Sequence, residues 1–112
     1  MSLRQKQSLF ARMVALLILK AYELGYEVTL GEAWRTPAQA LRNAADGSGI
    51  SNSLHLDRLA IDLNLFKDGR YLSSTESHKL LGEWWEQQHV LARWGGRFGD
   101  GNHYSLAHEG RK

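Results

Sequence analysis

A histidine and an aspartate near the middle of the chain are of types that bind metal ions. His55 precedes Asp62 by seven positions, and imidazole and carboxylate are both common Zn²⁺ ligands. Residues 60–66 alternate large aliphatic side chains with small or polar ones, which predicts a strand with Asp62 on the less apolar face. His55 would lie on the loop before it. A turn histidine and an aspartate ending a strand would give the same pattern, so the rest of the chain must decide.

A glycine-rich segment over residues 93–104 supplies a second pair of such side chains. Its glycines allow tight bends, and Asp100 and His103 are three positions apart, so one turn can bring both to the same side. His55, Asp62 and His103 can then offer three protein ligands to zinc, with no evident fourth. Three ligands and an open position are typical of catalytic zinc, whereas structural zinc has four protein ligands.

A catalytic zinc site needs further groups around it. Zinc lowers the pKa of bound water, and a carboxylate must then move the proton to the leaving amine. Asp100 suits this role because it is next to a ligand without being one. Arg35, where a predicted strand meets a predicted helix, can stabilise an oxyanion or bind a substrate carboxylate. A surface arginine in a loop is the alternative for Arg35. Ser53 would form a hydrogen bond near the site.

Composition narrows the class of protein. A length of 112 residues predicts one domain over 1–112, and the absence of cysteine excludes disulfides and cysteine-based zinc fingers. The net charge of +2 is scattered along the chain, which argues against nucleic-acid binding. The apolar run at residues 14–19 is short and flanked by Arg12 and Lys20, so we expect a core helix and neither a signal peptide nor a membrane span.

Periodicity and turn residues predict the elements that must position these side chains. In chain order we expect an amphipathic helix over 2–24 ended by Gly25, a strand over 26–33, a helix over 37–45 capped by Thr36, a loop at 46–49, a strand over 60–66, a hairpin turn at 67–70, a strand at 71–72, a helix from 73–76 to about 89, and a strand over 104–106. His78 and His89 would be surface or border residues of the last helix, and His108 would lie in a solvated tail.

Three motifs resemble those of a known family. Ser53-x-His55-x(6)-Asp62 resembles the Ser-x-His-x(6)-Asp motif of the zinc D-Ala-D-Ala carboxypeptidases and L-alanyl-D-glutamate endopeptidases. These are the VanY-like peptidases and phage endolysins that share a fold with the hedgehog signalling domain. Residues 94–104 are similar to the family's second motif, in which an acidic base stands three positions before the third zinc ligand. Residues 34–39 resemble the Tyr-Arg-[Ser/Thr] segment that carries the family's arginine.

The resemblance implies an α+β fold, in which a small antiparallel sheet carries the metal site and packs against an N-terminal helix and a second long helix. It implies a zinc-dependent peptidoglycan peptidase that acts on the stem peptide. The implied site has the metal ligands His55, Asp62 and His103, the catalytic residues Asp100 and Arg35, and the substrate-binding residues Ser53, Arg35 and Gln39. We expect a monomer without membrane insertion, made in the cytoplasm without a signal peptide and acting on the cell wall after release.

Alternatives within this resemblance concern the bond and the activity. L-alanyl-D-glutamate cleavage is favoured over D-Ala-D-Ala cleavage because residue 100 is aspartate and not glutamate. A non-catalytic zinc-containing binding domain is the other alternative, although such a domain needs neither Asp100 nor Arg35. Two departures stand out: Arg58 replaces a frequent glycine, and Asp-Gly-Asn-His at 100–103 replaces Asp-x-Pro-His, which implies a looser turn before His103.

Overall fold

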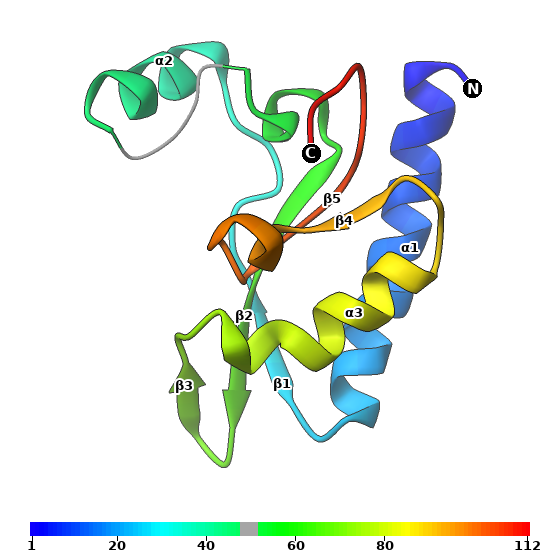
Figure 1. The fold of residues 1–112 in the computed structure, drawn as a ribbon, viewed down its shortest axis with the longest axis vertical. Helices are drawn as coiled ribbons and strands as arrows, with labels where there is room; N and C mark the ends of the chain where they lie inside the picture. Colours follow the sequence, from blue (N-terminus) through cyan, green and yellow to red (C-terminus); the bar gives the residue numbers. More distant parts are fainter. Residues whose placement is uncertain (48–51) are drawn as a thin grey trace.

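A five-stranded antiparallel sheet forms the centre of the protein (Figure 1). The computed structural model describes residues 1–47 and 52–112, so part of the loop predicted at 46–49 lies outside the described residues. The strands are β1 (Glu27–Leu30), β2 (Ala60–Lys67), β3 (Arg70–Leu72), β4 (Ala92–Trp94) and β5 (His103–Leu106). Their order is β1-β2-β5-β4, with β3 also paired to β2. The long strand β2 therefore contacts every strand except β4 and is the element on which the others align.

Helices and short 3₁₀ turns connect and cover these strands. They are α1 (Leu3–Glu23), α2 (Pro37–Ala45), η1 (Leu54–Asp57), η2 (Glu76–His78), α3 (Lys79–Gln87) and η3 (Gly95–Phe98). The helices α1 and α3 pack against the sheet, whereas α2 projects away at the upper left of Figure 1. Phe10 of α1 meets Trp85 of α3 edge to face at 5.9 Å between ring centroids. None of the helices in residues 1–47 and 52–112 combines the length and apolar character needed to cross a membrane.

Local signals placed several elements correctly. The side chain of Ser2 accepts from the Gln5 amide at the start of α1, and Gly25 follows this helix with a φ of +91°. Thr36 caps α2 as predicted. The hairpin between β2 and β3 turns at Asp68 and Gly69, both with positive φ, as expected of a type I′ turn. The α+β class, with an N-terminal helix on an antiparallel sheet, is confirmed.

The helix α3 is shorter than the helix predicted from 73–76 to about 89. The Ser74 side chain accepts a hydrogen bond from the Ser77 amide at 3.1 Å, and the Ser77 and His78 amides donate to the carbonyls three residues before them, which is 3₁₀ bonding. The 3₁₀ turn η2 precedes α3 in the chain, and α3 itself runs only from Lys79 to Gln87. The strand β1 is also shorter than the strand predicted over 26–33. The strand β4 was not predicted, because its three residues are too few to show an alternating pattern.

Arg58, at a position where the resembling motif often has glycine, has a backbone conformation that favours glycine. It follows η1 with a φ of +55°, in the left-handed region that glycine adopts without steric cost. Its guanidinium lies over the ring of Trp34, 4.5 Å from the ring centroid. A cation–π contact of this kind contributes about 0.5–1 kcal/mol, which offsets part of the cost of the left-handed backbone.

The prediction that His78 is a surface or border residue is wrong. Its side chain is buried, and its Nδ1 lies 2.8 Å from the Tyr104 hydroxyl on β5. Burial lowers the pKa of His78 to about 4. His108 was also predicted to be solvated, but it is half-buried, with its Nδ1 2.9 Å from the Lys6 ammonium of α1. Both contacts join residues far apart in sequence, so no local pattern could reveal them.

The buried His78 predicts a pH-dependent stability of the metal-free protein. Its pKa is about 4 when folded, against 6.5 for a free side chain, so the unfolded chain binds more protons between these values. The contribution of neutral His78 to the free energy of unfolding is fully present above pH 6.5. It is lost as the pH falls toward 4, by up to about 3 kcal/mol. We expect urea unfolding of metal-free protein to show this loss, and a His78→Gln variant to lack it. Parallel pH profiles for the two proteins would contradict the assignment to His78.

Candidate active site

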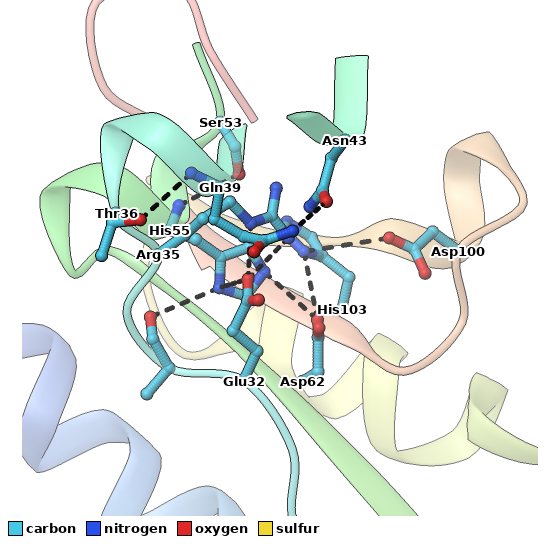
Figure 2. Close-up of polar contacts among 11 residues, drawn as sticks. Glu32, Arg35, Thr36, Gln39, Asn43, Ser53, His55, Asp62, Asp100 and His103 are labelled. Carbon is cyan, nitrogen blue, oxygen red and sulfur yellow. Dashed lines mark hydrogen bonds and ion pairs between the residues drawn. The ribbon is translucent and has the colours of Figure 1, made fainter. Parts of the chain in front are cut away.

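Strand register and a 3₁₀ turn bring His55, Asp62 and His103 together (Figure 2). Asp62 on β2 is paired directly with His103 on β5. The side chain of Ser53 caps η1 by accepting from the His55 amide at 3.2 Å, which directs His55 toward this pair. His55 Nε2 and His103 Nδ1 lie 3.3 and 3.5 Å from Asp62 Oδ1. One ligand atom from each of the three residues therefore falls within 4.8 Å of the others.

The chemistry of these groups fits a metal ion. His55 Nδ1 lies 3.3 Å from the Ala33 carbonyl oxygen, which favours a proton on Nδ1 and an unprotonated Nε2. In that tautomer Nε2 and the Asp62 carboxylate are two acceptors facing each other, and a cation between them satisfies both. Burial opposes ionisation of Asp62, but His103 and His55 outweigh it when their rings carry the facing proton, and they lower the pKa of Asp62 to about 2. A cation held in place of that proton would favour the ionised carboxylate in the same way. A carboxylate that is ionised at neutral pH, beside two imidazoles, suits Zn²⁺.

Main-chain hydrogen bonds hold the turn that carries Asp100 and leads to His103. The expectation that it is looser than an Asp-x-Pro-His turn stays a prediction. The Asp100 amide donates to the Gly95 carbonyl at 2.8 Å, and the His103 amide donates to the Asp100 carbonyl at 3.1 Å. A β-carbon at Gly95 would overlap the Asp100 carbonyl, and one at Gly101 would overlap the backbone of Thr75. Glycine at 95 and 101 therefore allows the backbone to pack closely enough for these main-chain bonds to hold the turn.

Trp94 anchors this turn to α3. Its ring fills the space where a β-carbon of Gly82 or Gly96 would lie, and its Nε1 donates to the Gly101 carbonyl at 2.7 Å. Glu86 on α3 accepts from the Trp94 amide at 3.2 Å. Through these contacts α3 fixes the position of the segment that carries Asp100 and His103.

Asp100 and Arg35 lie at the same cavity as the three candidate ligands. Asp100 Oδ2 is 3.9 Å from His103 Nδ1, and its side chain is half-exposed. Partial burial raises the pKa of Asp100 above that of an ordinary aspartate. The cavity has a volume of about 570 Å³. Its lining residues are Arg35, Asn52, Ser53, Leu54, His55, Asp62, Phe98, Asp100, His103, Gly110, Arg111 and Lys112.

Gln39 differs from the other predicted site residues because it does not line the cavity. The residues that line the cavity do not include Gln39, and its side chain forms hydrogen bonds to other residues of α2. Its Nε2 donates to Asn43 at 2.6 Å, and its Oε1 accepts from Arg42 at 2.8 Å. Binding of substrate by Gln39 therefore stays a prediction that requires these two bonds to be exchanged.

Glu32 belongs to the site but was not predicted. Its Oε1 lies 2.7 Å from Arg35 Nε, 2.6 Å from Arg35 Nη2 and 3.5 Å from His55 Nδ1 (Figure 2). The three-residue spacing from Arg35 gives a weak signal, since charged pairs at that spacing are common on surfaces. The contact with His55 depends on how the chain after β1 lies against β2.

Comparison with known proteins identifies the fold. No protein-family model matches the sequence, and no curated protein matches it. The crystal structure of the Serratia marcescens L-Ala D-Glu endopeptidase ChiX is similar to this chain, with a TM-score of 0.70 over 88% of this chain and 77% of ChiX. The chain has the ChiX fold. This structural similarity supports the hedgehog/DD-peptidase type of fold that the motifs predicted. At 19% sequence identity it shows the fold alone.

Proposed function

We propose that this protein is a zinc-dependent peptidoglycan peptidase that hydrolyses the L-Ala–D-Glu bond of the stem peptide. One observation carries the proposal: two histidines and an aspartate at ligand spacing share a cavity with Asp100 and Arg35. The fold supports it, because a protein described as an L-Ala D-Glu endopeptidase has the same fold. This substrate implies that the protein acts on the cell wall.

The roles of the protein's own groups follow from their positions. A zinc ion held by His55, Asp62 and His103 would supply Lewis-acid polarisation and a more acidic water. Asp100 borders the cavity next to His103, where its carboxylate can take a proton from the attacking water and deliver it to the leaving amine. Arg35 offers a positive charge to the oxyanion or to a substrate carboxylate.

Digestion of purified peptidoglycan tests the proposal. Zinc-loaded protein, chelator-treated protein and protein resupplied with zinc are incubated with the polymer, and the new ends are identified by mass spectrometry. We expect new amino groups on D-Glu with the zinc-loaded and resupplied samples and none with the chelated sample. Release of D-Ala instead would assign the D-Ala-D-Ala carboxypeptidase activity. Bound zinc without any new ends would overturn the enzyme assignment and indicate a binding domain.

A further inference from the structure

Glu32 joins three parts of the candidate site through separate contacts. Its Oε1 receives both Nε and Nη2 of Arg35, at 2.7 and 2.6 Å, and lies 3.5 Å from His55 Nδ1. Its main-chain carbonyl accepts from the Asp62 amide at 2.9 Å. The Arg35 side chain is 13% exposed and that of Glu32 is 33% exposed, so the ion pair is partly shielded from water. Figure 2 shows Glu32 beside Arg35 and His55.

We propose that Glu32 is a positioning residue that fixes the Arg35 guanidinium and offsets its charge beside the metal ligands. The role rests on the proposed peptidase function. Charge-assisted hydrogen bonds from arginine to carboxylate are strong and directional, so they restrain a long and otherwise flexible side chain. Both bonds use Nε and Nη2, which leaves Nη1 free of Glu32 and able to contact a substrate oxygen.

Charge gives Glu32 a second effect on the site. A guanidinium close to three metal ligands disfavours a bound cation, and a carboxylate between Arg35 and His55 reduces that repulsion. A carboxylate near the outer nitrogen of a ligating histidine also helps to orient the ring, together with the Ala33 carbonyl. Loss of the Glu32 charge should therefore weaken zinc binding as well as disturb Arg35.

The backbone around Glu32 is fixed independently of its side chain. The Gly31 amide donates to the Asp62 carbonyl at 2.8 Å, and the Asp62 amide donates to the Glu32 carbonyl at 2.9 Å. A β-carbon at Gly31 would lie 2.8 Å from the Asp62 carbonyl oxygen, so the chain runs close against β2. These bonds do not involve the Glu32 carboxylate, so Glu32→Gln can change the charge while the chain path is kept.

A double-mutant cycle in the 112-residue chain tests the proposal. The variants are Glu32→Gln, Arg35→Ala and the double variant, with Glu27→Gln on the exposed part of β1 as the matched control. We expect Glu32→Gln to raise KM for a stem-peptide substrate about tenfold with a smaller change in kcat, and to weaken zinc binding about tenfold in a chelator competition. In the Arg35→Ala background the same substitution should not raise KM further. Glu27→Gln should change neither quantity.

A measurement that needs no turnover separates this proposal from the peptidase function. The Nε–H signal of Arg35 in NMR should exchange slowly with water in the wild type and rapidly in Glu32→Gln. If the wild type cleaves nothing, the peptidase function fails, while the NMR and zinc measurements still decide the role of Glu32. Unchanged Arg35 exchange, or KM effects of the two substitutions that simply multiply, would overturn the positioning role.

Discussion

Replacing Asp100 by asparagine should lower turnover on the stem peptide by about 10²–10⁴-fold while zinc remains bound at one per chain. The amide cannot take a proton from water, but it nearly matches the carboxylate in size. The turn at Asp100 is held by main-chain bonds from Asp100 to Gly95 and from His103 to Asp100, so the position of His103 should be kept. Steady-state kinetics and elemental analysis of the same preparation measure the two quantities.

Asp68→Asn is the matched control for Asp100→Asn. Asp68 lies in the β2–β3 turn with a φ of +53°, which asparagine tolerates, and it does not line the cavity. The control should retain wild-type turnover. Turnover of Asp100→Asn within a few-fold of the wild type would remove Asp100 from the proton transfers. Loss of zinc from this variant would show that Asp100 is a ligand.

Replacing His103 by alanine should abolish stable zinc binding, with a loss of affinity greater than about 100-fold. Outer partners of metal ligands already cost about 10–100-fold when removed, and the loss of a ligand should cost more. His103 begins β5 directly opposite Asp62, and its removal leaves only His55 and Asp62 of the three clustered ligands. Zinc content after dialysis gives the answer, and circular dichroism shows whether the chain is still folded.

His89→Ala is the control that removes a different histidine. His89 follows α3, and its Nδ1 accepts from the Leu91 amide at 3.0 Å, away from the cavity. This variant should keep its zinc. A folded His103→Ala variant with unaltered zinc content would show that the ligand set is wrong.

The grouping of the site residues could be predicted because each motif spans only a few positions and contains residue types whose chemistry is recognisable. The Ser53–Asp62 spacing, the Asp100–His103 turn and Arg35 each show in a few residues, and the structure brings them to one cavity. The helix caps and the hairpin turn are equally local. Such features depend on neighbours in sequence, which a pattern can display.

The features that could not be predicted depend on contacts between distant segments. His78 is buried because Tyr104 on β5 lies against it, although its own helix gives no sign of this. Glu32 reaches His55 because the chain after β1 follows β2 as far as Asp62. Gly82 is required by the ring of Trp94, which is twelve residues further along the chain. In each case the partner is specified by the packing of the sheet and not by the local sequence.

Hydrolysis of a defined peptide in ¹⁸O-labelled water tests the central claim most directly. The substrate is N-acetyl-L-Ala-γ-D-Glu-L-Lys, and the products of the zinc-loaded protein are weighed by mass spectrometry with and without a chelator. The account predicts N-acetyl-L-alanine carrying one ¹⁸O atom and a D-Glu-containing product with a free amino group, both absent when the zinc is removed. An intact peptide with zinc bound, or cleavage that persists after zinc removal, would contradict it.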